Sequence, residues 1–269
     1  MNSIVKAFEK IGTRVKFSDL SKRQTRFRRI RNASTGRDIS LIVDIEKDKQ
    51  GEFYKIETDG SVDLHIMNID KELNHLLLFA RDKYKAKYRF LCGLDERGWF
   101  AAAVPGAVSN ISDAMDSLKP KQVIAAQKNI KTEKKNRRKN EAFLRQGEWF
   151  FLPAPDISPP AELILKNEPI QRGPGNPHKV QEIFRTGGEV VYVCRKYPQG
   201  VSFKKYREIM KNPEAILMGW RTMKVNMTVY GKGRVTHRDH QTIVLKGWYQ
   251  ILPNRETESW FIENLVFLD

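Results

Sequence analysis

The tetrapeptide His237-Arg-Asp-His240 places two of the chain's five histidines on either side of a carboxylate. Two imidazoles and the Asp239 carboxylate could bind zinc or manganese if a third ligand came from elsewhere in the chain. The spacing resembles the H-x-D of a two-histidine, one-carboxylate iron site, but no histidine follows His240. A cupin pattern also fails, because no glutamate lies between residues 241 and 247. Four polar residues between apolar segments are equally typical of a hairpin turn or of a loop that contacts phosphate.

His178 ends the loop Gly-Pro-Gly-Asn-Pro-His, after which the sequence predicts a short helix over residues 179–185. Amide groups at a helix start attract anions, so His178 could hold a phosphate or act as a general acid in phosphodiester cleavage. A capped loop with a surface histidine is the alternative. A metal-assisted phosphodiesterase would use His178, His237, Asp239 and His240. We expect instead that the chain binds no stoichiometric metal and no cofactor, and that it is not catalytic alone.

The positive charge of the chain is concentrated in two segments. The 48 Lys and Arg residues outnumber the 32 Asp and Glu residues by 16. Residues 22–37 contain seven bases and no acid, and residues 119–145 contain ten bases against Glu133 and Glu141. These two segments therefore carry nearly the whole excess of positive charge.

Clustered Lys and Arg residues favour a nucleic-acid partner, because cations placed at phosphates release condensed counterions. The predicted phosphate-binding residues, from both segments, are Arg23, Arg26, Arg28, Arg29, Arg31, Lys131, Lys134, Lys135, Arg137, Arg138 and Lys139. The first segment is rich in arginine, whose forked guanidinium matches phosphate oxygens, and the second is a lysine-rich track. The alternatives are solvated faces that serve solubility, or an adaptor that binds an acidic protein in a larger assembly. The sequence does not distinguish DNA from RNA.

The remaining chemistry-bearing residues predict little catalysis. Cys92 and Cys194 form no C-x-x-C pair, which favours a reducing cytoplasm. Cys92 is expected to be buried, with its pKa raised by the nearby carboxylates of Asp95 and Glu96. The same two acids, with Asp82, form a weak candidate site for a divalent ion. No stretch approaches 18 apolar residues, so we expect no membrane partner.

The elements that must position these residues indicate an α+β fold. Short apolar runs separated by turn residues predict an N-terminal antiparallel β-meander, with strands at 39–46, 52–57, 62–69, 76–81, 87–93 and 99–104. A basic connecting helix is predicted over 121–146, before a proline-rich linker. A β-rich C-terminal part with a few helices follows, with strands at 189–195, 224–236 and 241–252 and a helix near 202–211. The expected domains are residues 1–118, 119–160 and 161–269.

Overall fold

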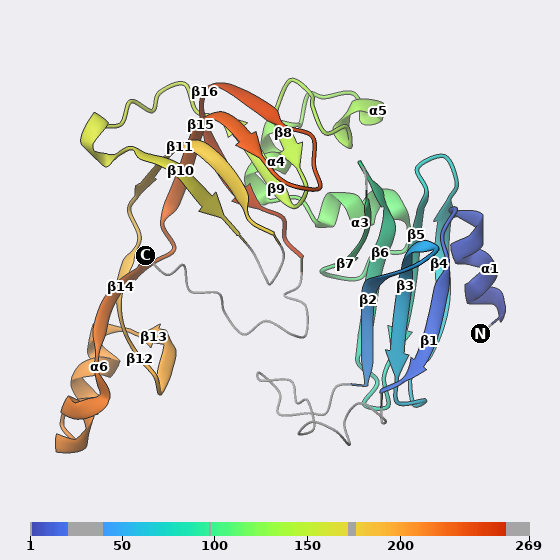
Figure 1. Ribbon diagram of the computed structural model, residues 1–269, viewed down its shortest axis with the longest axis horizontal. Coiled ribbons are helices and arrows are strands. Elements are labelled where there is room, and N and C mark those ends of the chain that lie inside the picture. Colours follow the sequence, from blue (N-terminus) through green and yellow to red (C-terminus); the bar gives the residue numbers. More distant parts are fainter. Residues whose placement is uncertain (1, 21–39, 97, 172–175, 257–269) are drawn as a thin grey trace. The chain divides into compact units, whose positions relative to one another are not determined.

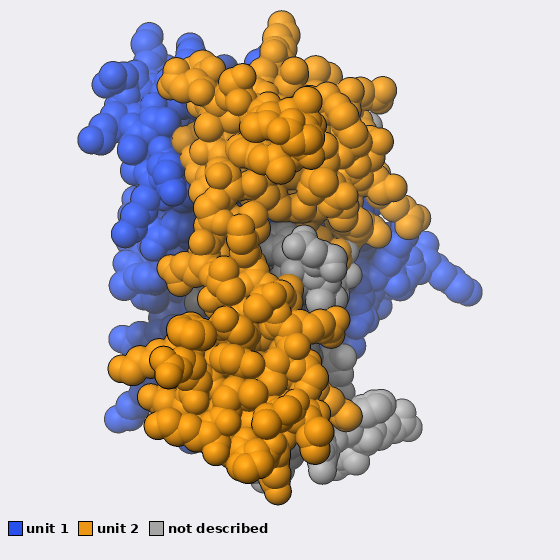
Figure 2. Space-filling view, turned by 90° about the vertical axis from the view of Figure 1, so that its left-hand side faces the viewer, with its two compact units in different colours: residues 1–150, 239–241, 253–262 blue, residues 151–238, 242–252, 263–269 orange. Residues whose placement is uncertain are grey.

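The computed structural model describes residues 2–20, 40–96, 98–171 and 176–256. The fold is a β-rich α+β fold with several antiparallel sheets, as the sequence predicted (Figure 1). The chain forms two compact units, which Figure 2 shows in different colours. The first unit contains residues 1–150, 239–241 and 253–262, and the second contains residues 151–238, 242–252 and 263–269.

The first unit opens with helix α1 (Asn2–Lys10), which buries Ile4, Ala7 and Phe8 on one face. Strand β1 (Val15–Asp19) then runs parallel to β3 (Gly51–Thr58), and β3 pairs in antiparallel fashion with β2 (Leu41–Asp48). The strands of this sheet lie in the order β1-β3-β2. The sequence predicted the β2–β3 hairpin, but β1 was not predicted.

A second sheet of the first unit is the expected meander, with the order β4-β5-β6-β7. Its strands are β4 (Asp63–Asp70), β5 (His75–Arg81), β6 (Lys87–Asp95) and β7 (Gly98–Ala103). The predicted six-stranded meander is wrong in one respect, because β2 and β3 belong to the other sheet. Residues 75–80 of β5 are all buried, which is typical of a strand covered on both faces.

The core of the first unit lies between its two sheets and α1. Phe8, Tyr54, Leu76, Leu78 and Cys92 are among its buried members. The Tyr54 hydroxyl donates a hydrogen bond to the carbonyl oxygen of Phe100 at 2.6 Å, which satisfies a polar group that is otherwise fully buried.

Helix α3 (Ile111–Ser117) covers the other face of the meander, where Ile111 and Ala114 pack with Leu77 and Leu91. Its N-cap is Asn110, whose side chain accepts a hydrogen bond from the Asp113 amide.

The long basic helix predicted over 121–146 does not form. The segment contains two short helices, α4 (Lys121–Ala126) and α5 (Thr132–Lys135), and then strand β8 (Leu144–Gln146). Only Val123 is buried in α4 and no residue is buried in α5, so neither helix has an apolar face that would stabilise a longer one. The Asn140 side chain accepts hydrogen bonds from the amides of Ala142 and Phe143, which favours a turn over a helix.

The second unit contains an antiparallel run of strands in the order β10-β11-β15-β16. These are β10 (Leu165–Ile170), β11 (His178–Thr186), β15 (Thr228–Thr236) and β16 (Ile243–Pro253), preceded in the chain by β9 (Trp149–Pro153) and the short helix η1 (Ala161–Leu163). The helix predicted at 179–185 is wrong, because this segment is strand β11. The predicted strand 224–236 is interrupted at Asn226, which has a φ of 58°.

A smaller part of the second unit, residues 189–225, is named here the aromatic module. Its sheet has the order β13-β12-β14, from β12 (Glu189–Cys194), β13 (Tyr197–Val201) and β14 (Arg221–Val225). Helix α6 (Phe203–Ile209) and helix η2 (Pro213–Met218) connect β13 to β14 (Figure 1). The sequence predictions of β12 and α6 are confirmed. Tyr206 of α6 stacks on Tyr192 with ring centroids 4.0 Å apart, so aromatic packing holds the helix on its sheet.

Lys119 is a buried cation that holds the turns of the basic segment together. Its Nζ lies 2.6 Å from Asp116 Oδ1, 2.6 Å from Asn136 Oδ1 and 3.1 Å from the carbonyl oxygen of Lys135. Burial lowers the pKa of this ammonium, and the hydrogen bond to Asp116 opposes that shift. The charge of Lys119 therefore has a structural role.

Replacing Lys119 should destabilise the first unit. We expect Lys119→Ala to lower the free energy of unfolding by about 2–4 kcal/mol, because it leaves several acceptors without their charged donor. Lys121→Ala, at an exposed position of α4, is the control and should change it by less than about 0.5 kcal/mol. Urea unfolding measures both, and equal effects would contradict the structural role.

His75 should make stability depend on pH. Burial lowers its pKa below the ordinary value near 6.5, although the Leu73 carbonyl oxygen receives a hydrogen bond from the ring. The unfolded chain then binds a proton at this residue more readily than the folded chain as pH falls below about 6.5, so this contribution to stability is present above that pH and is lost below it. Urea unfolding between pH 7.5 and 5 should show a smaller loss of stability in His75→Gln than in the parent or in His65→Gln. An unchanged profile in His75→Gln would contradict this assignment.

Candidate functional site

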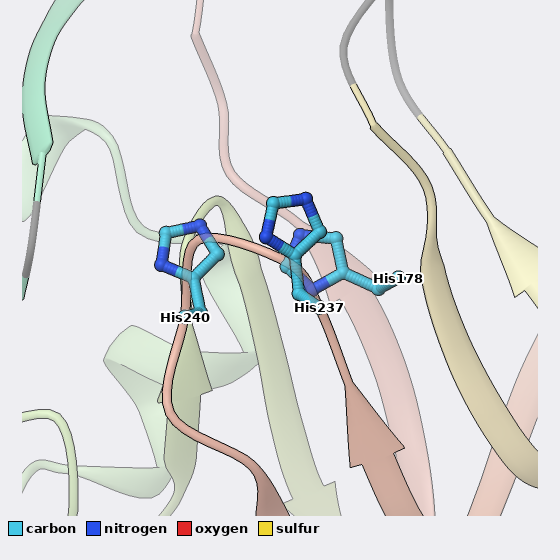
Figure 3. Close-up of side chains that lie close together, drawn as sticks. All are labelled: His178, His237 and His240. Carbon is cyan, nitrogen blue, oxygen red and sulfur yellow. The ribbon is translucent and has the colours of Figure 1, made fainter.

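The predicted turn at residues 237–240 is confirmed, since it connects β15 to β16. His178 is the first residue of β11, and its neighbour Lys179 pairs with Thr236 at the end of β15. This register sets His178 beside His237. Their rings stack with centroids 4.2 Å apart and an interplanar angle of 23° (Figure 3). His178 is buried, with 1% of its surface exposed, and is therefore not the surface residue of the alternative interpretation.

Two of the four candidate catalytic residues, His178 and His237, come together within the second unit. The other two, His240 and the exposed Asp239, belong to the first unit.

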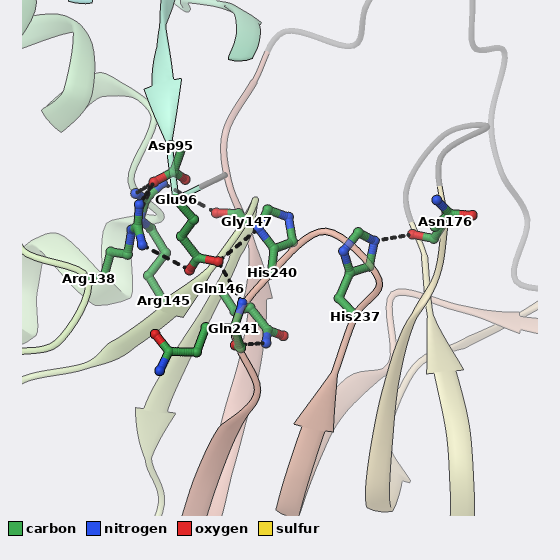
Figure 4. A network of polar contacts seen from close by, with 10 residues as sticks. All are labelled: Asp95, Glu96, Arg138, Arg145, Gln146, Gly147, Asn176, His237, His240 and Gln241. Carbon is green, nitrogen blue, oxygen red and sulfur yellow. Dashed lines mark hydrogen bonds and ion pairs between the residues drawn. The ribbon is translucent and has the colours of Figure 1, made fainter. Parts of the chain in front are cut away.

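Glu96 orients the histidine at the end of the turn. Its Oε2 accepts a hydrogen bond from the backbone amide of Gln241 at 2.8 Å and lies 3.3 Å from Nδ1 of His240 (Figure 4). Its Oε1 lies 3.1 Å from Nη1 of Arg138. Only 6% of the Glu96 side chain is exposed, so this carboxylate is a buried acceptor with partners on both oxygens.

His237 also has a hydrogen-bond acceptor, which lies just before β11. Its Nε2 lies 3.0 Å from the carbonyl oxygen of Asn176, which precedes β11 (Figure 4). A carbonyl oxygen can only accept, so Nε2 of His237 is the donor in this contact. At His240 the Glu96 carboxylate is the acceptor, so Nδ1 is the donor.

Part of the second basic segment is neutralised by acids. Arg138, a predicted phosphate-binding residue, lies 2.7 Å from Asp95 Oδ1, and Arg145 lies 3.0 Å from the same oxygen. Lys134 pairs with Glu141 at 3.3 Å. The exposed cations of the segment are Lys121, Lys128, Lys131, Arg137 and Lys139. Lys135 is half-buried.

The first basic segment falls outside the described residues. Arg23, Arg26, Arg28, Arg29 and Arg31 all belong to residues 21–39, whose placement is not described. Their predicted role in binding nucleic acid stays a prediction.

Sequence reasoning missed the charge of the aromatic module. Eight of its cations are exposed, and no ion pair joins any of them to another described residue: Arg195, Lys196, Lys204, Lys205, Arg207, Lys211, Arg221 and Lys224. Only three acids, Glu189, Glu208 and Glu214, lie in the same module. These cations are spread over 30 residues of sequence and form no dense run. A charge count over the strand–helix–strand unit, instead of over consecutive residues, could have found them.

Aromatic side chains accompany these cations. Phe203 at the start of α6 is 56% exposed, and the Arg207 guanidinium lies 5.9 Å from its ring centroid. Tyr197 stacks on Trp220 with centroids 5.6 Å apart. By contrast, Trp149, Phe150 and Phe151 of β9 are buried, as core residues are.

The structure describes the surroundings of Cys92 and of the acids that were considered as a site for a divalent ion. Cys92 is fully buried, as expected, and burial is what raises the pKa of its thiol, not the acids that follow it. Asp82 accepts hydrogen bonds from the amides of Tyr84 and Ala86 in its own turn, whereas Asp95 pairs with arginines. These partners account for the acids without a divalent ion.

Comparison with known proteins gives no relative: no family model, no curated protein and no solved structure matches the chain. Within the described residues, no helix combines the length and apolar character needed to cross a membrane. The function must therefore be argued from the residues themselves.

The Cys92 thiol should be inert in the folded protein. Because burial raises its pKa and excludes reagents, iodoacetamide should leave Cys92 unmodified under native conditions and alkylate it in urea. Peptide mass spectrometry measures the modification. Rapid native alkylation of Cys92 would contradict its burial in the core.

Proposed function

We propose that the protein binds nucleic acid through phosphate contacts, with the aromatic module as its principal binding surface. The observation that carries the proposal is the set of eight exposed cations on this module without ion-pair partners among the described residues. Cations already paired with carboxylates gain little from a phosphate, whereas solvated cations release counterions when they bind one. The module therefore offers more usable charge than the segment 119–145.

The aromatic residues support the choice of nucleic acid over an acidic protein. Phe203 presents a largely exposed ring near Arg207, and the exposed Lys204 and Lys205 follow it in the sequence. An exposed ring beside cations can stack on a base while the cations contact the flanking phosphates.

The exposed cations of the second basic segment extend this proposal. Lys131, Arg137 and Lys139 keep their predicted role as phosphate contacts, because they are exposed. Arg138 is the weakest member of the predicted set, because its guanidinium pairs with both Asp95 and Glu96.

Salt dependence and charge removal test the proposal. We expect the triple variant Lys204→Ala, Lys205→Ala, Arg207→Ala to weaken binding to a 20-nucleotide oligonucleotide at least tenfold at 100 mM salt. It should also reduce the slope of log affinity against log salt by about 2 to 3, because three phosphate contacts are lost. Fluorescence anisotropy between 50 and 200 mM salt measures both quantities.

The control removes the same charge elsewhere. Lys47, Lys49 and Lys71 are exposed residues of the first unit, and their triple alanine variant should bind almost as the parent does. Equal losses in both triple variants would show that only net charge matters. Absence of binding by the parent at 50 mM salt would overturn the proposed function and favour the adaptor.

A further inference from the structure

We propose that the aromatic module prefers single-stranded nucleic acid to a duplex, and that Phe203 stacks on an unpaired base. This preference rests on the proposed function, since it names the class of nucleic acid that the same module would bind. Three features carry it: an exposed ring, the row of rings that supports it and the cations nearby. All of these residues belong to the second unit.

The position and exposure of Phe203 are unusual for a phenylalanine. It is the first residue of α6 and follows the N-cap Ser202, whose side chain accepts a hydrogen bond from the Lys205 amide. This cap fixes the residue at which the helix begins. The Phe203 ring is 56% exposed, although phenylalanine is among the residue types most often buried. Among the described aromatic residues, only Tyr84 of the first unit is similarly exposed, at 45%.

A row of four further rings supports Phe203. The Phe203 ring centroid lies 5.9 Å from that of Tyr192, and Tyr192 stacks on Tyr206 at 4.0 Å with an interplanar angle of 10°. Tyr206 meets Trp220 edge-on at 5.1 Å, and Trp220 stacks on Tyr197 at 5.6 Å. A ring held in place by such contacts loses little conformational entropy when a base stacks on it.

An exposed apolar side chain and two cations accompany this ring. Val190 lies two residues before Tyr192 on β12, so both side chains point to the same face of the sheet, and Val190 is 51% exposed. Lys224 of β14 pairs with Val190 and presents its side chain on that face as well. The Arg207 guanidinium lies 5.9 Å from the Phe203 ring centroid. Cations from both β14 and α6 can therefore contact the phosphates that flank a stacked base.

The exposed ring favours a single strand for a physical reason. In a duplex the bases stack on one another, whereas a single strand can turn a base onto a protein ring. Cations alone do not give this preference, because each phosphate of a duplex that is neutralised releases more condensed counterions than a phosphate of a single strand. A preference for single strands therefore requires a contact besides charge. The exposed ring of Phe203 can supply that contact.

Binding of matched probes to the full chain tests this preference. The probes are a labelled 20-nucleotide oligo-dT strand and the duplex that it forms with oligo-dA, measured by fluorescence anisotropy at 100 and 200 mM salt. We expect the parent to bind the single strand at least fivefold more tightly than the duplex. This ratio should rise with salt, because the affinity for a duplex falls more steeply with salt and stacking is not a charge contact.

Variants of Phe203 separate stacking from charge and from packing. Phe203→Ala should weaken single-strand binding about 5-fold to 30-fold and duplex binding less than about twofold, because it removes a ring and no charge. Phe203→Leu retains apolar bulk and should lose single-strand affinity in the same way, whereas Phe203→Trp retains a ring and should keep that affinity. Tyr84→Ala is the matched control, because it removes an exposed ring that has the Lys83 ammonium 5.4 Å from its centroid. This control should bind both probes as the parent does.

The outcomes distinguish this preference from the proposed function. Equal or tighter binding of the duplex by the parent would overturn the preference and leave nucleic-acid binding in place. Equal losses for both probes in Phe203→Ala would show that the ring only supports the module, which would also overturn it. Binding of neither probe at 50 mM salt would overturn both proposals. If circular dichroism shows that Phe203→Ala is unfolded, the affinity ratio of the parent and the comparison of Phe203→Leu with Phe203→Trp decide.

Discussion

Two carboxylates at the end of β6 organise much of what surrounds the candidate site. Asp95 and Glu96 are largely buried, with 14% and 6% of their side chains exposed. A buried carboxylate is costly unless donors and cations surround it. Arg138 and Arg145 supply the cations, and the amide of Gln241 supplies a further donor. The segment after α5 and the turn that carries His240 are therefore both anchored to the same pair of acids.

This constraint changes the meaning of the positive charge. The segment 119–145 has the greatest excess of bases among the described residues, yet Lys119, Arg138 and Arg145 of this segment serve the fold. These three cations already contact acceptors within the protein, so a phosphate would add little binding energy to them. The aromatic module has no comparable buried acid, and its cations remain in solvent. The segment with the most basic residues is therefore not the segment with the most exposed, unpaired cations among the described residues.

The same Glu96 connects the electrostatics to the histidines. It accepts a hydrogen bond from the Gln241 amide and faces His240 Nδ1, so it fixes both the end of the turn and the orientation of the ring. Arg138, on its other oxygen, favours the charged form of the carboxylate. Glu96 therefore positions the His240 ring and the Gln241 backbone, and it is itself held in a left-handed conformation with a φ of 54°.

The sequence by itself determined most strands, the burial of Cys92 and the turn at 237–240, because apolar alternation and turn residues act over a few neighbours. Tertiary structure alone decided that residues 178–186 form a strand, since the pairing of β11 with β15 overrides local preference across about 50 residues. It also decided which cations are neutralised and that His178 meets His237. Ion pairs and ring contacts of this kind join segments distant in the chain, and no local pattern encodes the strand register that brings them together.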